Sequence, residues 1–137
     1  MENISSSVIK SKFKRSKLNL NKTKLWEELS LSVQQIISAE INLIDNEQEI
    51  ICYYNNEYWW ILTNRGITIY DNKNISHIKL SEILNIELPG DIKKNSTNDF
   101  LKIFTQNIVE TLKLEKSSWF VIVEILKFIT KKNINVK

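Results

Sequence analysis

The sequence predicts one α+β domain, in which seven antiparallel strands form a barrel or sandwich, a C-terminal helix closes it, and an extra helix precedes the strands. Three patterns support this fold class. Apolar residues recur every three or four positions within 24–38, which is typical of an amphipathic helix. They form short alternating segments between 49 and 114, as half-buried strands do. A strongly apolar run then fills 119–129. With 137 residues, the chain is large enough for one core and too short for two ordinary domains.

Residues 1–22 are rich in lysine and serine, and they predict a flexible basic arm ahead of a single domain at 23–137. Residues 1–26 carry seven basic side chains and one acidic one, whereas residues 27–137 carry twelve basic and fifteen acidic ones. Apolar residues in the arm are too scattered to form a packed face. A solvated leader is therefore the simplest interpretation.

An alternative role for the arm is attraction to an anionic membrane surface, because basic residues near such a surface lower the free energy of binding. Nucleic acid is not expected as a partner, since the arm has no structured reader. The cations assigned to an anionic surface are Lys10, Lys12, Lys14, Arg15 and Lys17.

The first predicted helix spans about 24–38, with Thr23 as its N-cap. Seven strands are expected to follow, separated by turns that rely on asparagine and aspartate because the chain has only two glycines and one proline. A polar segment at 89–99 is interpreted as a loop. The expected strands are 49–54, 58–63, 67–70, 75–80, 83–88, 100–105 and 108–114.

The last predicted helix spans about 117–132, and it carries two apolar stripes. One stripe would be enough to close the barrel, and it consists of Trp119, Ile122, Leu126 and Ile129. The second stripe consists of Val121, Ile125 and Phe128. A helix that is apolar nearly all round is buried on both sides or meets another chain. Cover by the N-terminal segment and a partner interface are both open for the second stripe.

Two adjacent tryptophans in the strand 58–63 raise the same question on the sheet. Trp59 and Trp60 point to opposite faces because side chains alternate along a strand. One of them must lie outside the barrel core. The favoured interpretation is that the helix around Trp26 covers it, and the alternative is that Trp59 belongs to an exposed aromatic patch for a partner.

The order of seven strands and one C-terminal helix resembles that of pleckstrin-homology-like domains, and the local sequence is similar to their bacterial and GRAM-related branches. The resemblance is carried by Trp60-Ile61-Leu62-Thr63-Asn64-Arg65-Gly66-Ile67-Thr68-Ile69-Tyr70 and by Ile78-Lys79-Leu80-Ser81-Glu82-Ile83. It covers roughly 47–130 and implies a barrel that binds a lipid headgroup or a protein. Phosphoinositide-binding members place cations on the first two strands and in their loop. Here the stretch 49–64 has no lysine or arginine, which favours binding to protein.

Catalytic chemistry is not predicted. His77 and Cys52 are the only histidine and the only cysteine, so neither a histidine cluster nor an internal disulfide can form. A Cys52–His77 dyad on adjacent strands is the one catalytic alternative, and no neighbouring residue would activate it. The sequence contains no Walker A, GxGxxG, GxSxG or HExxH motif. We therefore expect no enzyme activity, no cofactor and no metal.

The leading functional hypothesis is a noncatalytic module that binds another protein, either a cognate effector or a second copy. Trp59, Val121, Ile125 and Phe128 are the residues expected to meet it. Small bacterial chains of this type resemble immunity or accessory proteins found beside toxins, which implies inhibition of a cognate effector. The alternative is a peripheral membrane adaptor that binds anionic lipid through the basic arm. A cytoplasmic location is expected, because the longest apolar run is too short to cross a bilayer as a helix.

Overall fold

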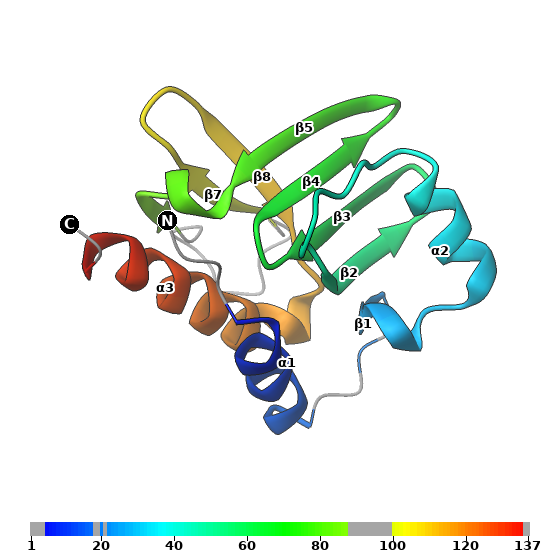
Figure 1. Ribbon diagram of the computed structural model, residues 1–137, viewed down its shortest axis with the longest axis horizontal. Coiled ribbons are helices and arrows are strands. Elements are labelled where there is room, and N and C mark those ends of the chain that lie inside the picture. The colour runs from blue at the N-terminus through cyan, green and yellow to red at the C-terminus, as the bar shows by residue number, and fades with distance from the viewer. Residues whose placement is uncertain (1–4, 18–19, 21, 88–99, 136–137) are drawn as a thin grey trace.

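The computed structural model describes residues 5–17, 20, 22–87 and 100–135. Its helices and strands are α1 (Ser6–Arg15), β1 (Thr23–Leu25), α2 (Leu31–Ser38), β2 (Glu49–Asn55), β3 (Tyr58–Thr63), β4 (Gly66–Asp71), β5 (Asn74–Lys79), β6 (Asn85–Glu87), β7 (Phe100–Phe104), β8 (Val109–Lys113) and α3 (Trp119–Asn135). The strands form two antiparallel sheets, in the orders β1-β2-β3-β4-β5 and β6-β7-β8. Figure 1 shows α3 below the two sheets, with α1 beside it and α2 at the edge of the view.

Strands β2 to β8 confirm the predicted antiparallel sheets, and their bounds lie within two residues of the expected ones. The turn between β4 and β5 uses Asn72 and Lys73, whose φ angles are 49° and 75°. Two successive residues with positive φ match the twist of a tight hairpin, and asparagine adopts this conformation more readily than most residues. The predicted loop at 89–99, together with Leu88, lies outside the described residues.

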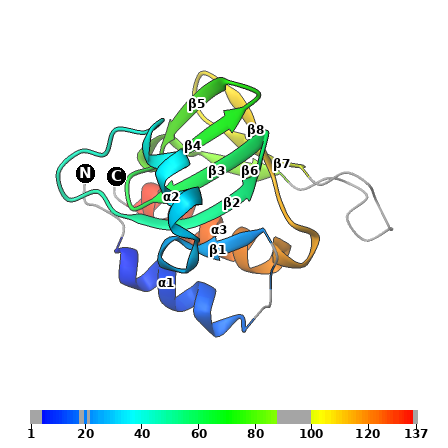
Figure 2. The same cartoon turned by 90° about the vertical axis from the view of Figure 1, so that its right-hand side faces the viewer.

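The first sheet buries side chains on both faces. Its inner face, which includes Tyr53, Trp60 and Ile69, contributes to a large core that also contains the buried residues of the second sheet and α3. Its outer face carries a smaller core around Cys52 and Trp59. Figure 2 shows α2 lying in front of this outer face. The sheet is therefore the middle layer of the molecule.

Helix α3 closes the large core as predicted, and a 3-10 turn at Lys116–Ser118 precedes it. The first predicted stripe, Trp119, Ile122, Leu126 and Ile129, is buried. The helix ends at Asn135 rather than at residue 132. None of the helices in the described part of the chain is both long and apolar enough to cross a membrane.

The predicted helix over 24–38 is wrong in its first half. Residues Thr23–Leu25 form β1, which pairs with the free edge of β2, and Trp26–Glu28 form a 3-10 turn. The strand is favoured because it buries Leu25 and satisfies backbone groups along β2. Helix α2 therefore starts later, with the Ser30 hydroxyl rather than Thr23 at its N-cap. Thr23 instead donates its N–H and hydroxyl to the Glu115 carboxylate, at 2.9 and 3.0 Å.

The predicted flexible arm is also wrong over Ser6–Arg15, which forms helix α1. The Ser5 hydroxyl caps it by accepting the Val8 N–H at 3.5 Å. Ile9 and Phe13 lie four residues apart, so they share one face of the helix, and both are buried in the large core. This apolar pair is too short to stand out in a lysine-rich segment. It forms a packed face only because α3 offers an apolar surface opposite.

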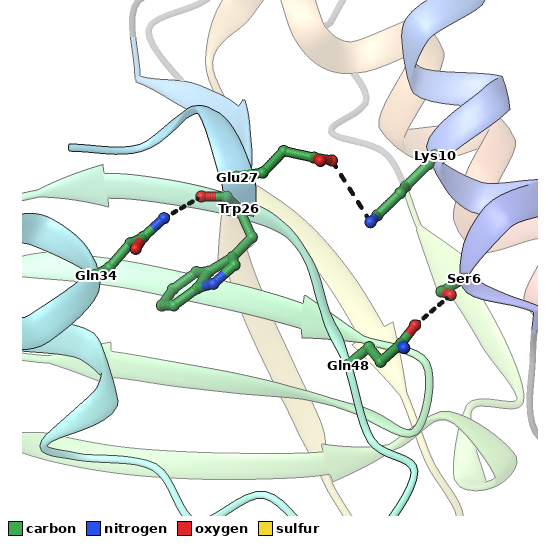
Figure 3. Close-up of polar contacts among 6 residues, drawn as sticks. All are labelled: Ser6, Lys10, Trp26, Glu27, Gln34 and Gln48. Carbon is green, nitrogen blue, oxygen red and sulfur yellow. Dashed lines mark hydrogen bonds and ion pairs between the residues drawn. The ribbon is translucent and has the colours of Figure 1, made fainter. Parts of the chain in front are cut away.

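Polar contacts also join α1 to the first sheet and its neighbouring turns (Figure 3). The Ser6 hydroxyl donates to the Gln48 side-chain oxygen at 2.7 Å, and Lys10 pairs with Glu27 at 3.5 Å. Such exposed pairs contribute less than about 1 kcal/mol each. They set the direction of α1, while burial of its apolar face supplies most of the stabilisation.

The two sheets are joined at one corner by side chains that bond to the backbone of Lys113 at the end of β8. The Trp60 indole N–H donates to the Lys113 carbonyl oxygen at 2.7 Å, and the Lys113 N–H donates to the Tyr58 hydroxyl at 2.9 Å. Both aromatic residues come from β3. Tyr53 stacks on the Trp60 ring, with centroids 6.3 Å apart, and meets Tyr58 edge-on at 5.9 Å. Side chains thus connect the sheets where no strand pairing does.

The bond at Tyr58 predicts a loss of stability at alkaline pH. Burial raises the pKa of Tyr58 to about 12, and the charges of Asp71 and Glu110 add to this effect while the Lys113 N–H opposes it. An unfolded tyrosine titrates near pH 10, so the folded state keeps its proton where the unfolded state loses it. The contribution of neutral Tyr58 to the free energy of unfolding is therefore complete below pH 10 and falls as pH rises to about 12. The total loss is on the order of 2 kcal/mol.

The measurement is urea unfolding across pH 8 to 12 for the wild type and for Tyr58→Phe. The variant should be less stable at pH 8, because the Lys113 N–H loses its acceptor. Its free energy of unfolding should then fall less steeply above pH 10 than that of the wild type. If the free energy of unfolding fell equally steeply with pH in both proteins, Tyr58 would not be the group responsible for the loss.

Candidate functional site

The first predicted partner-binding residue, Trp59, is not at the surface. Its side chain is 1% exposed and stacks on Tyr70 of the neighbouring strand β4, with ring centroids 5.1 Å apart. Ile37 of α2 and the side chain of Trp26 pack against the same small core. The Gln34 amide donates to the Trp26 carbonyl oxygen at 2.8 Å and holds that turn in place (Figure 3). The N-terminal segment therefore covers Trp59, and the exposed aromatic patch is ruled out.

The second stripe of α3 is not a free surface either. Val121 and Ile125 are buried in the same core as Ile9 and Phe13 of α1. Phe128 is half-buried and packs at the edge of this core. The predicted partner interface is therefore wrong at Val121 and Ile125, which are buried within the same chain, while Phe128 is half-buried.

The five cations predicted to meet an anionic surface differ in whether their side chains are paired within the chain. Lys10 is paired with Glu27, and Lys12 is paired with Glu124 of α3 at 3.3 Å. The Lys12 ammonium also lies 4.8 Å from the centre of the Phe128 ring. By contrast, the exposed side chains of three cations have no hydrogen bond or ion pair within the described part of the chain. These are Lys14, Arg15 and Lys17.

Sequence reasoning missed the most exposed aromatic residue among those described, Phe120. Its side chain is 91% exposed in the first turn of α3. It belongs to neither apolar stripe of the helix, so neither the large core nor α1 covers it. Its position outside both apolar stripes is the one sequence signal that could have identified Phe120 as exposed. A side chain this exposed provides little packing within the chain.

Phe120 borders a groove of about 610 Å³ between α1 and α3. The residues that line it are Lys12, Arg15, Ser16, Ser117, Phe120, Val121 and Glu124. The Lys12–Glu124 pair spans the groove and neutralises itself, which leaves the Arg15 guanidinium as its uncompensated charge. The groove thus combines an apolar ring with one available cation. We take it as the candidate site.

A smaller groove of about 170 Å³ lies between the 40–47 segment and strands β3 to β5. Several of its polar groups are already engaged within the chain. The Glu47 carboxylate accepts from the Thr63 hydroxyl at 2.6 Å and from the Ile44 N–H at 3.1 Å. His77 Nδ1 lies 3.1 Å from the Thr68 hydroxyl.

The proposed Cys52–His77 dyad does not form. Cross-strand pairing places Cys52 beside Ile61, Ile61 beside Thr68 and Thr68 beside His77, so two strands separate the sulfur from the imidazole. Burial also raises the pKa of the Cys52 thiol far above its ordinary value, which disfavours the thiolate. Among the described residues, no three histidine, cysteine, aspartate or glutamate side chains are grouped to hold a metal ion.

Comparison with solved structures places this architecture among known folds. A DUF1696-family protein with a pleckstrin-homology domain from Shewanella loihica PV-4 matches 81% of this chain and 99% of its own, with a TM-score of 0.55 and 15% sequence identity. The chain has a pleckstrin-homology-like fold. Strands β2 to β8 and α3 supply its expected order of elements, and α1, β1 and α2 precede them.

A second structure with the pleckstrin-homology-like fold, a pleckstrin homology domain from Shewanella amazonensis SB2B, matches 87% of this chain and 96% of its own. Its TM-score is 0.49 and its sequence identity is 20%. Comparison of the sequence with protein-family models and with curated proteins found no match.

Proposed function

We propose that this chain is a noncatalytic binding module that recognises another protein through the groove between α1 and α3. The observation that carries the proposal is the 91% exposure of Phe120 beside that groove. Burying a phenylalanine side chain against a partner stabilises a complex by about 1.5–3 kcal/mol. Aromatic and arginine side chains near a pocket are also typical of residues that dominate binding energy.

The noncatalytic part of the proposal is supported by the chemistry of the two residues that could have formed a nucleophilic pair. The Cys52 thiol is buried among apolar side chains, and two strands lie between it and His77. The groove is lined by two serines, but the Ser16 hydroxyl donates to the Phe13 carbonyl oxygen at 2.6 Å. Among the described residues, no hydrogen bond joins the other serine, Ser117, to a base. The groups of the groove are suited to holding a partner rather than to transforming a substrate.

The finer form of the proposal is inhibition of a cognate effector. A small module that occupies the active surface of a toxin needs no chemistry of its own, only a stable interface. If this form is correct, co-expression with the effector encoded nearby should relieve its toxicity. Phe120→Ser should abolish that relief while the module remains folded.

Site-specific crosslinking tests the binding surface directly. A photoreactive phenylalanine analogue at position 120 should form a covalent adduct with one protein in the organism that encodes the chain. The matched control places the analogue at Lys131, which is exposed near the other end of α3. A single adduct from position 120 and none from position 131 is the expected result. The same adducts from both positions, or none from position 120, would contradict the proposal.

The second candidate function is peripheral membrane binding, which is favoured by the exposed cations Lys14, Arg15 and Lys17 and by the exposed Phe120. Removing the whole segment would not test it, because Ile9 and Phe13 belong to the core. The sharper variant replaces the three cations by glutamine. Sedimentation with phosphatidylserine vesicles at low salt that is lost in this variant would support a membrane role. Sedimentation that is absent, or unchanged in the variant, would exclude it.

A further inference from the structure

We infer that the partner inserts an apolar side chain against Phe120 and places a carboxylate against Arg15, so that an acidic protein segment occupies the groove. This inference rests on the proposed function and adds the chemistry of the partner. It follows from which groups in the groove are already engaged and which are not.

The apolar half of the site is Phe120. The second stripe of α3 is occupied by α1, and the first is occupied by the barrel core, so Phe120 is left to pack against something else. Phe120 lines the groove, so a partner side chain in the groove would contact its ring. Val121 also lines the groove but is only 5% exposed.

The charged half of the site is Arg15. Lys12 is held by Glu124 at 3.3 Å and by the Phe128 ring, so its charge is largely satisfied. Arg15 lines the same groove, and its guanidinium makes no hydrogen bond or ion pair with the described side chains. A guanidinium presents a planar set of donors that fits a carboxylate with two parallel hydrogen bonds.

The charge around the groove also favours an acidic protein segment. Lys14 and Lys17 are exposed on either side of Arg15, so the end of α1 is positive beyond the groove itself. The chain from residue 27 onward is acidic overall. An acidic segment is therefore attracted to this end of the molecule and repelled elsewhere, which orients its approach.

Binding to a bilayer and binding of a carboxylate in the groove depend on these cations to different degrees. An anionic membrane attracts each nearby basic residue about equally, roughly 1 kcal/mol for each. A carboxylate in the groove instead depends on Arg15, which lines it, much more than on Lys14, which does not. Lys14→Gln is therefore a matched control for Arg15→Gln, because both remove one positive charge from the last turn of α1.

The experiment selects short random peptides displayed on phage against the full chain and measures the enriched peptides by fluorescence anisotropy. The expected peptides contain aspartate or glutamate near an aromatic or aliphatic residue. Phe120→Ser and Arg15→Gln should each weaken their binding about tenfold or more, and Arg15→Lys by less. Lys14→Gln should change it by no more than about twofold. Replacing the peptide carboxylates by amides should weaken binding about as much as Arg15→Gln does.

The outcomes separate this inference from the proposed function. Peptides that need Phe120 but show no preference for carboxylates, or no loss with Arg15→Gln, overturn the inference and leave the binding surface standing. Peptides whose affinity is unchanged by Phe120→Ser overturn both the inference and the proposed function.

Two other occupants of the surface would be recognised by different results. Vesicle binding weakened equally by Arg15→Gln and Lys14→Gln, without any peptide that needs Arg15, assigns the surface to a bilayer. A wild-type dimer dissociated by Phe120→Ser assigns it to a second copy, and either result overturns the inference. Because all three positions are exposed, unchanged thermal midpoints check that the variants fold.

Discussion

Replacing Trp60 by alanine should lower the free energy of unfolding by about 3–5 kcal/mol, the range typical for truncating a buried tryptophan. The side chain is 1% exposed, stacks on Tyr53 and packs in the large core between the two sheets. Its loss would leave a cavity at the corner where the sheets meet. The Lys113 carbonyl oxygen would also lose the indole N–H that it accepts at 2.7 Å. Since the free energy of unfolding of a domain of this kind is roughly 5–15 kcal/mol, this one substitution removes a large part of it.

Trp60→Phe is the control that separates packing from hydrogen bonding. It keeps an aromatic ring in the core and removes the indole donor, so we expect a loss of about 1–3 kcal/mol. Chemical denaturation monitored by circular dichroism measures both variants, because three other tryptophans would confuse a fluorescence comparison. If Trp60→Ala costs no more than Trp60→Phe, then Trp60 does not fill the corner between the sheets.

The second large effect concerns α1. Ile9→Ala should lower the free energy of unfolding by about 2–5 kcal/mol, because the side chain is completely buried against the core that contains Val121 and Ile125. The change removes three buried carbons and exposes part of the second stripe of α3. We also expect increased binding of a hydrophobic dye, since the loosened α1 would uncover an apolar surface.

Lys14→Ala is the matched control, because it lies in the same helix on the exposed side. Its effect should be within about 0.5 kcal/mol. Urea unfolding of the two variants and the wild type gives the comparison. If Ile9→Ala is as mild as Lys14→Ala, then the N-terminal segment is an arm after all and α1 does not belong to the domain.

The strands were predictable because their signal is local. Residues 58–63 form a short run rich in aromatic and β-branched residues between polar turn residues, which predicts a strand without knowledge of its neighbours. Strand β3 forms over Tyr58–Thr63. The same reasoning located α3, because a run of nine apolar residues among eleven needs no partner to be recognised as buried. The resemblance to the pleckstrin-homology-like fold then ordered these elements correctly.

The two N-terminal errors have a common cause. Thr23–Leu25 has too few residues for its pattern to separate strand from helix, and the free edge of β2 decided between them. Ile9 and Phe13 are only two apolar residues in a segment of lysines and serines, and their helix is stabilised by α3, more than a hundred residues away. Short elements depend on tertiary contacts, because their own backbone hydrogen bonds do not offset the entropy of ordering them.

The sequence by itself determined the seven strands, the closing helix, the two faces of the Trp59–Trp60 strand and the two apolar stripes of α3. It could not determine which apolar surface covers which, because periodicity describes one element at a time and burial is a property of pairs. Only the tertiary structure placed α2 over Trp59 and α1 over Val121 and Ile125. With those surfaces covered from within the chain, the site that we propose for a partner moved to the exposed Phe120 and the groove beside Arg15.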